Sequence, residues 1–301
     1  MNRRVARVLV TGASGQIGQA LTVYLSERGI EVTALSRRAD GLSAVDRSVI
    51  GDATSVADVA SALEGVDSVV HLAAIAHRDL GTPYAVYSTN VNSTFNVLSQ
   101  AGQRGVDRAV IASSIHAYGV PLNPHDPPPA YFPLDEDIPA DIGDWYSLSK
   151  CSDELTAQMA WRHWGIDVVA LRFPLVKSTT ALREEAAVVR ANPVTMMRLG
   201  WAYLDLQDAV RAIHLSLTAE LHGAHVLALS AADTLIDRPT SELVEEFAAG
   251  VPVRHVLSGH QALVDASRAA RLIGFTPEVS IHQRSTDRPS PIGERPLQGG
   301  P

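Results

Sequence analysis

The chain has 301 residues, 46% hydrophobic and 19% charged, and can bury a full core as two domains or as one large α/β domain. The formal net charge of −8 disfavours nucleic acid binding, and the single cysteine excludes an intramolecular disulfide and a multi-cysteine metal site. No apolar run approaches the ~18 residues that span a membrane. We therefore expect a soluble, cytoplasmic protein without a nucleic acid, membrane or metal partner.

Strand-like and helix-like segments alternate along the first part of the chain, and glycines follow several of the helices. The predicted strands are Val5–Val10, Glu31–Leu35, Ser48–Ile50, Asp67–Leu72, Arg108–Ala112 and Asp167–Leu171. The predicted helices are Gln16–Arg28, Val56–Leu63, Tyr84–Arg104 and Trp145–Trp164. This alternation predicts an α/β fold with a Rossmann-like, doubly wound parallel sheet and a smaller C-terminal substrate-binding region.

Two segments interrupt the alternation. Seven of the seventeen prolines lie between Pro121 and Pro139, which predicts a loop over residues 121–143 that acts as a lid on a site. Residues 284–301 are rich in proline, glycine and charge and are predicted to be a disordered tail.

The segment between these two parts is expected to form a small region of its own. We predict a dinucleotide-binding domain over residues 1–176 and a substrate-binding or lid region over residues 177–283, with some of its segments returning to the sheet. The elements predicted here are helices Leu206–Thr218, Thr240–Ala249 and Gln261–Leu272, and strands near Ala202–Leu204 and His225–Leu229.

A glycine-rich turn joins the first strand to the first helix. Gly12 permits the tight turn, Gly15 lets the backbone approach a pyrophosphate, and Gly18 lets helix and strand pack closely. The helix N-terminus offers free N–H groups to phosphates. A plain glycine turn is the alternative, but the strand before it and the helix after it favour dinucleotide binding. The other residues expected to contact the dinucleotide here are Ser14, Gln16 and Ile17.

The end of the second strand selects the cofactor. An acidic residue at that point favours NAD, because it binds the ribose 2′-hydroxyl, whereas this chain has Ser36, Arg37 and Arg38. Two guanidinium groups and a hydroxyl suit a 2′-phosphate, so NADP(H) is predicted over NAD(H). The alternative is that the arginines are solvated surface residues. Asp52, followed by Ala53, is placed to meet the adenine amine or is a simple turn aspartate.

Tyrosine and lysine lie four residues apart at the start of the long helix Trp145–Trp164. Tyr146 and Lys150 therefore share a helix face, where the ammonium stabilises a phenolate. Such a tyrosine can donate a proton to a carbonyl or remove one from an alcohol. Ser114, after the strand Arg108–Ala112, supplies a hydroxyl that can hold the reacting oxygen.

Together these motifs resemble an extended short-chain dehydrogenase/reductase of the NAD-dependent epimerase/dehydratase family. The similarity covers residues 5 to about 176 well and the remainder weakly. The residues that carry it are the turn Thr11–Gly18, His71–Ala74, Asn90–Thr94, Ser113–Gly119, Tyr146–Lys150 and Leu171–Pro174.

The resemblance assigns roles to individual residues. It makes Ser114 the catalytic serine, Tyr146 the general acid/base, and Lys150 the residue that holds the nicotinamide ribose and tunes the tyrosine. It also implies a homodimer formed through the long helices. The residues that it adds to the cofactor cleft are Leu72, Ala73, Ala74, Asn90, Phe173 and Pro174.

Departures from the family pattern narrow the reaction. The family's dehydratases carry an Asp-Glu pair after the catalytic serine, where this chain has Ile115 and His116, so dehydration is not expected. Nucleotide-sugar epimerases carry an asparagine where this chain has Leu175. The Trp201 stretch is similar to that of uronate dehydrogenases, which act on free sugars, although their cofactor is NAD.

The substrate is therefore predicted to lack a nucleotide, unless Arg183 or Arg198 replaces the missing diphosphate contacts. Ile115, His116, Leu175 and Trp201 are the candidate substrate contacts, with a structural His116 and a core Trp201 as alternatives.

The predicted function is an NADP(H)-dependent ketoreductase or dehydrogenase. It acts on a sugar or a natural-product-like small molecule. The alternatives are an NAD-dependent sugar or nucleotide-sugar epimerase and a non-catalytic NADP(H) sensor.

Overall fold

The computed structural model describes residues 3–42 and 44–282. Seven parallel strands form one sheet in the order β3-β2-β1-β4-β5-β6-β9. The order reverses at β1, as in a doubly wound sheet, so the predicted Rossmann-like fold is confirmed. The strands are β1 (Arg7–Thr11), β2 (Glu31–Ser36), β3 (Arg47–Ile50), β4 (Ser68–His71), β5 (Arg108–Ser114), β6 (Asp167–Phe173) and β9 (Ala224–Ala228).

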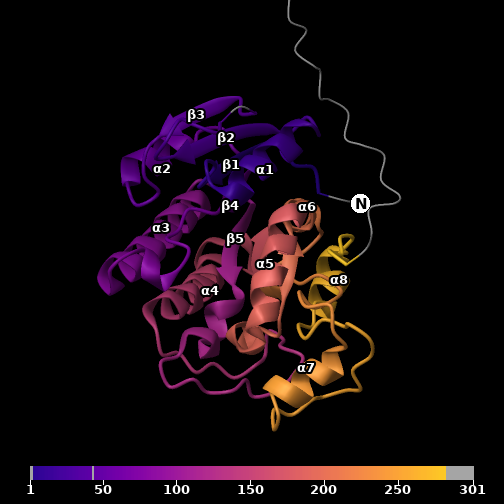
Figure 1. The fold of residues 1–301 in the computed structure, drawn as a ribbon. Coiled ribbons are helices and arrows are strands. Elements are labelled where there is room, and N and C mark those ends of the chain that lie inside the picture. Colours follow the sequence, from indigo (N-terminus) through magenta and orange to yellow (C-terminus); the bar gives the residue numbers. More distant parts are fainter. Residues whose placement is uncertain (1–2, 43, 283–301) are drawn as a thin grey trace, which may run out of the picture.

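Helices cover both faces of this sheet (Figure 1). On one face, α1 (Gln16–Ser26), α6 (Leu206–Thr218) and α8 (Ser267–Ile273) contribute to one hydrophobic cluster. On the other face, α2 (Val56–Ala62), α3 (Pro83–Gln103) and α4 (Trp145–Trp164) contribute to a second. The residues of β1, β2 and β4 are almost all buried, which explains the continuous apolar runs in these parts of the sequence.

A third hydrophobic cluster lies beyond the carboxyl ends of the strands. It joins α5 (Thr179–Ala191) and α7 (Thr240–Phe247) to the 3₁₀ segments Ile115–Tyr118 and Pro193–Leu199. A short two-stranded sheet of β7 (Leu175–Lys177) and β8 (Tyr203–Asp205) connects this cluster to the main sheet. The division of the chain at residue 176 stays a prediction, and α6, α8 and β9 pack within the main sheet's own cluster.

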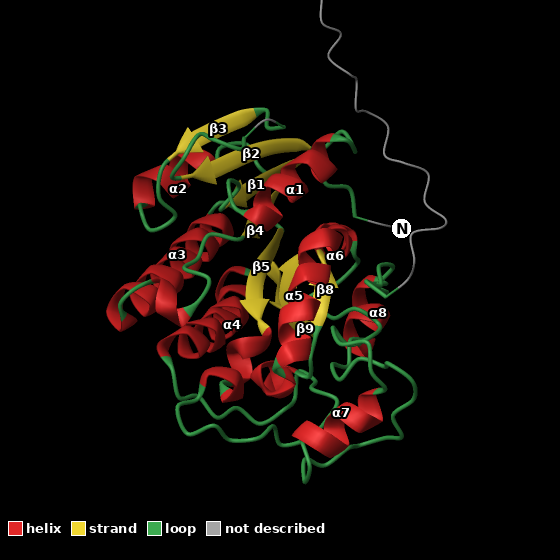
Figure 2. Cartoon of the chain, viewed as in Figure 1, coloured by secondary structure: helices red, strands yellow, loops and turns green. Residues whose placement is uncertain are grey.

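The proline-rich segment 121–143 is mostly loop, as predicted (Figure 2). Hydrogen bonds anchor the centre of this loop. Phe132 is fully buried and its N–H donates to the carbonyl of Pro252 at 2.8 Å. The N–H of Leu134 donates to Leu263 at the same distance. The loop is therefore built into the third cluster.

Two elements differ from the sequence predictions. The helix expected over Gln261–Leu272 is limited to Ser267–Ile273, because the residues before it form bridges: Gln261 with Asp233, and Val264 with Leu134. Helix α5 was not predicted, although Ser178 caps it. The disordered tail predicted over 284–301 lies outside the described residues. Within the described ranges, no helix is long and apolar enough to cross a membrane.

Candidate active site

The glycine turn lies between β1 and α1 and needs its glycines. Gly12 has a φ of +68°, and a Cβ there would lie 2.7 Å from the backbone nitrogen of Ala73. A Cβ on Gly18 would lie 2.4 Å from the carbonyl oxygen of Gly12. Helix α1 begins after Gly15 without a side-chain cap, so within the described part of the chain no side chain satisfies its first N–H groups. Such a cradle fits a dinucleotide's pyrophosphate.

A cavity of about 560 Å³ opens beside this turn. Eleven of the predicted cofactor residues line it, so the cavity follows the predicted path from the turn to the end of β2 and on past β4. These residues are Gly12, Ser14, Gly15, Ser36, Arg37, Arg38, Asp52, Ala53, Leu72, Ala73 and Ala74. The lining residues that the sequence did not suggest are Leu35, Gly51, Ile75, Thr89 and Ser93.

Asn90 is placed next to the cavity without lining it. Its side chain is buried, accepts a hydrogen bond from the Ile75 N–H at 2.7 Å, and donates to Ser149 Oγ at 3.0 Å. Asn90 thus links the backbone of Ile75 to α4, and Ile75 does line the cavity. The other predicted cofactor residues outside its lining are Gln16, Ile17, Gly18, Lys150, Phe173 and Pro174.

The end of β2 carries the polar groups that were expected to select the cofactor. Ser36 Oγ donates to Ser14 Oγ at 2.7 Å and accepts from the Arg38 N–H at 3.2 Å. The side chains of Arg37 and Arg38 are exposed at the cavity wall. This end of the cavity therefore combines two hydroxyls with two guanidinium groups.

Asp52 makes a turn and also lines the cavity. Its Oδ1 accepts from both the N–H and the hydroxyl of Thr54 at 2.8 Å. Burial alone would raise the pKa of Asp52, but these bonds and the charge of Arg37 outweigh it and lower that pKa. Asp52 is thus a carboxylate that can accept a further hydrogen bond.

Helix α4 presents Tyr146 and Lys150 from its first two turns. Its N-cap Asp144 accepts from the N–H groups of Tyr146 at 2.8 Å and Ser147 at 2.9 Å, which fixes where the helix begins. The Lys150 ammonium donates to the carbonyl of Ala112 on β5 at 2.8 Å. The predicted tyrosine and lysine are therefore both buried beside the carboxyl end of β5.

Ser114 lies at that strand end and is joined to His116. Its Oγ accepts from the His116 N–H at 3.1 Å and lies 3.0 Å from Nδ1 of the same histidine. The ring of His116 lies 5.8 Å from the ring of Tyr146, and the ring of His77 lies 6.3 Å from it. Ser114, His116, Tyr146 and His77 thus form one cluster of hydrogen-bonding groups.

The half-buried imidazole of His116 in this cluster is neutral. Burial, with smaller effects from the charges of His77 and Arg78, lowers the pKa of His116 to about 4. At neutral pH it can donate one hydrogen bond and accept another, but it carries no charge with which to hold an anion.

Trp201 lies in the core. It is fully buried, its indole N–H donates to the Pro193 carbonyl at 2.8 Å, and its ring packs edge-on against Phe247. The structure therefore places Trp201 in the third cluster, which is the alternative that the sequence left open. Ile115 is buried in the same cluster, and the half-buried Leu175 packs against it.

Arg183 and Arg198 are both engaged within the protein. Arg198 donates to the carbonyls of Pro127 and Asp126 and pairs with the Asp126 carboxylate at 3.0 Å. Arg183 donates to the carbonyl of Ile281 at 3.3 Å.

Comparison with known proteins identifies the family. The model of the NAD dependent epimerase/dehydratase family matches residues 8–228. The chain belongs to this family. The match spans almost the whole sheet, the glycine turn and the Ser114, Tyr146 and Lys150 positions.

Curated relatives include sugar and steroid dehydrogenases. An L-arabinose 1-dehydrogenase (NAD(P)(+)) of Haloferax volcanii is 30% identical over 187 residues, covering 60% of this chain and 71% of that protein. A 3-beta-hydroxysteroid dehydrogenase of Mycolicibacterium neoaurum is 38% identical over 118 residues, covering 36% of this chain and 32% of that protein. The chain thus matches about a third of the steroid enzyme's length.

Solved structures share the fold of this chain. A short-chain dehydrogenase/reductase superfamily protein from Agrobacterium tumefaciens with bound NAD has a TM-score of 0.69 and 22% identity, covering 91% of this chain and 93% of that one. The resemblance to an extended short-chain dehydrogenase/reductase is confirmed at the level of fold and family.

Proposed function

We propose that the protein is an NADP(H)-dependent oxidoreductase that interconverts a carbonyl and an alcohol. The observation that carries this proposal is the gathering of Ser114, Tyr146 and Lys150 at the carboxyl end of β5, near a cavity with a dinucleotide-type turn. Ligands of open α/β sheets bind at this end of the strands. The family match and the L-arabinose dehydrogenase relative support the same class of reaction.

The cavity residues suit NADP(H). The glycine turn would hold the pyrophosphate, and Arg37 and Arg38 would hold a 2′-phosphate with Ser14 and Ser36 between them. When bound, the nicotinamide ring supplies or accepts the hydride.

The protein's own groups handle the proton. Tyr146 donates its phenolic proton to the carbonyl oxygen in reduction and removes the alcohol proton in oxidation. Ser114 Oγ, held by His116, donates a hydrogen bond that orients the reacting oxygen. The Lys150 ammonium stabilises the phenolate that remains on Tyr146.

The surroundings favour an uncharged substrate without a nucleotide. His116 is neutral, and Arg198 is bound to the proline-rich loop, so neither offers a charge for a diphosphate. Hydroxyl and imidazole groups suit the hydroxyls of a free sugar or of a similar natural product. L-arabinose, the substrate in the name of one relative, is a sugar of this kind.

Two measurements test the proposal. Released dinucleotide should be identified by mass after denaturation, and empty protein should be titrated with NADPH and NADH. A site that prefers NADPH and exchanges it freely is expected. Stoichiometric, non-exchanging NAD would instead indicate an epimerase, which re-uses its cofactor within each turnover.

Replacing Tyr146 with phenylalanine separates catalysis from binding. Turnover of an aldose or ketone panel should fall by about 10²–10⁴-fold, because proton transfer is lost. The dissociation constant for NADPH should stay within about twofold of the wild-type value, since Tyr146 does not line the cavity. Full activity in Tyr146→Phe would refute the role of the tyrosine.

A further inference from the structure

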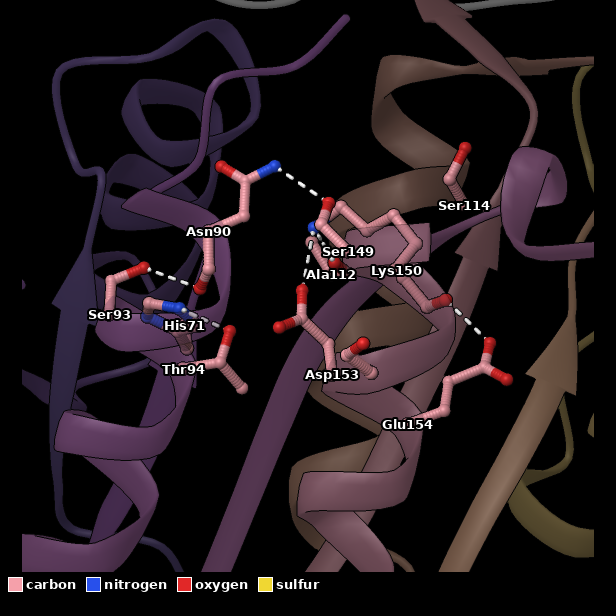
Figure 3. A network of polar contacts seen from close by, with 12 residues as sticks. His71, Asn90, Ser93, Thr94, Ala112, Ser114, Ser149, Lys150, Asp153 and Glu154 are labelled. Atoms are coloured by element: carbon pink, nitrogen blue, oxygen red, sulfur yellow. Dashed lines mark hydrogen bonds and ion pairs between the residues drawn. The ribbon is translucent and has the colours of Figure 1, made fainter. Parts of the chain in front are cut away.

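A buried carboxylate contacts the lysine of the catalytic cluster. Asp153 lies one turn after Lys150 on α4, and its Oδ2 is 3.3 Å from the Lys150 ammonium. The side chains are only 5% and 2% exposed, so solvent does not screen the pair (Figure 3). The same ammonium donates to the carbonyl of Ala112 at 2.8 Å. Lys150 is therefore held from two sides.

The neighbouring carboxylate has other partners. Glu154 accepts from Arg172 at 2.8 and 2.9 Å and from the Ser113 hydroxyl at 2.6 Å. In Figure 3 its carboxylate points to the opposite side of the helix from that of Asp153. Asp153 is thus the carboxylate in contact with Lys150, whereas Glu154 binds residues of β5 and β6.

A polar chain of uncharged groups continues behind Asp153 toward the glycine turn. Thr94 on α3 lies 3.2 Å from His71 Nε2, and His71 Nδ1 lies 2.8 Å from Thr11 Oγ1. Burial, and then the charge of Lys150, lower the pKa of His71 to about 3, so this imidazole is neutral. The group that balances the ammonium charge is Asp153, whose Oδ1 has no hydrogen-bond partner among the described residues.

We infer that Asp153 is a positioning residue, the buried counter-ion that keeps Lys150 charged and fixed beside Tyr146. The inference rests on the proposed function, which gives Lys150 its task. A buried ammonium without a partner would lose its proton or swing toward solvent, and either change would remove the positive charge from the tyrosine.

The electrostatics support this assignment. Burial alone would lower the pKa of Lys150, but Asp153, followed by Tyr146 and Glu154 on the same helix, raises it. Burial raises the pKa of Asp153 in spite of Lys150. Asp153 is the acidic side chain in contact with the ammonium, Tyr146 and Glu154 act on it only through their charge, and His71 on β4 is neutral. Lys150 therefore stays protonated at neutral pH.

The small number of lysines allows the protonation of Lys150 to be measured directly. The whole sequence holds two lysines, Lys150 and Lys177. Protein labelled with ¹³C at lysine Cε should show two titrating methylene signals by NMR, and the variant Lys177→Arg assigns them. Lys177 is about a third exposed and pairs with Glu185, so it serves as an internal reference.

Asp153→Asn should lower the titration midpoint of Lys150 by about one pH unit or more and leave that of Lys177 in place. Glu154→Gln is the matched control, because it removes a buried carboxylate from the same helix without breaking a contact to Lys150. Its effect on the Lys150 midpoint should be clearly smaller. Equal midpoints for Lys150 in wild type and Asp153→Asn would overturn the inference.

Thermal unfolding gives a second readout. Lys150→Met and Asp153→Asn should each lower the Tm, because each leaves one buried charge without its partner. The double variant leaves no such charge and should lose clearly less than the sum of the two losses. If a single variant fails to fold, recovery of folded protein in the double variant carries the same meaning. Strictly additive losses would show that Asp153 is only a structural residue.

Both readouts use the protein without cofactor or substrate. If wild-type protein turns over no carbonyl compound, the proposed function fails while the coupling of Asp153 to Lys150 can still be observed. If turnover is found and the coupling is absent, the positioning role fails alone.

Discussion

The carboxyl edge of the sheet has two ends, the cavity beside the glycine turn and the third hydrophobic cluster, and they are built in different ways. At the nucleotide end, backbone segments pack directly against one another, so Gly12 and Gly18 have no room for a Cβ. The cavity is lined by this turn and by the adjacent strand ends. At the other end, large side chains from distant segments, Phe132, Trp201 and Leu263, fill a common cluster. The first end depends on local chain geometry and the second on long-range packing, so substitutions at the two ends should have different consequences.

The largest expected effect is in the packed end. Trp201→Ala should lower the free energy of unfolding by about 3–5 kcal/mol, because a fully buried indole leaves a cavity and the Pro193 carbonyl loses its donor. Denaturant unfolding measures the loss, and NADPH affinity of the folded variant should be unchanged. Trp161→Ala, at a tryptophan that is 41% exposed, is the control and should cost far less. Comparable losses in the two variants would contradict the assignment of Trp201 to the core.

Substitutions at the nucleotide end should change cofactor affinity and leave stability almost unchanged. Replacing both Arg37 and Arg38 with alanine should weaken NADPH binding by about tenfold or more, since charge-assisted hydrogen bonds to a phosphate contribute about 1.5–3 kcal/mol each. Stability should change little, because both side chains are exposed. Titration with NADPH and NADH gives the ratio of affinities. An unchanged preference for NADPH would show that these arginines do not read the 2′-phosphate.

Acid should lower the stability of the protein through His71, which is buried at the end of β4. His71 takes up a proton near pH 6.5 when unfolded and near pH 3 when folded, so the unfolded state binds the proton first and stability falls as pH falls between these values. From pH 7 to pH 5 the loss from this group is about 2 kcal/mol. Urea unfolding of wild type and His71→Gln at both pH values checks it, with the variant less sensitive to pH. An equal dependence in both proteins would exclude His71 as the cause.

The smallest expected effect is at the N-cap of α4. Asp144→Ala should cost about 1 kcal/mol, because two N–H groups of the first turn lose their acceptor. The same change should lower turnover, since it loosens the turn that carries Tyr146. Asp144→Ser, which keeps a capping oxygen, should restore most of the stability. Loss of stability without any change in turnover would show that the cap does not position the tyrosine.

The contrast between the two ends also explains what the sequence could reveal. The turn from Thr11 to Gly18 and the residues after β2 and β4 lie together through local chain geometry, so their place around the cavity could be predicted. The position of Trp201 depends on Pro193 and Phe247, and the sequence does not show which neighbours a tryptophan meets.

Asp153 was missed for a related reason. It looks like an ordinary polar helix residue until α3 and β4 bring Thr94 and His71 behind it. Helix α5 shows the reverse case. Its cap Ser178 and its buried Leu182, Ala186 and Val189 give a helical pattern that is present in the sequence itself.

The anchored proline-rich loop has a consequence for how the molecule can be divided. Residues 121–143 lie in the N-terminal half of the chain, yet Phe132 and Leu134 are hydrogen-bonded to residues beyond 250. A fragment ending near residue 176 would expose both side chains and lose β9 from the sheet edge, so it should aggregate. Exchange of the C-terminal part with that of a relative would succeed only if this loop is moved together with it.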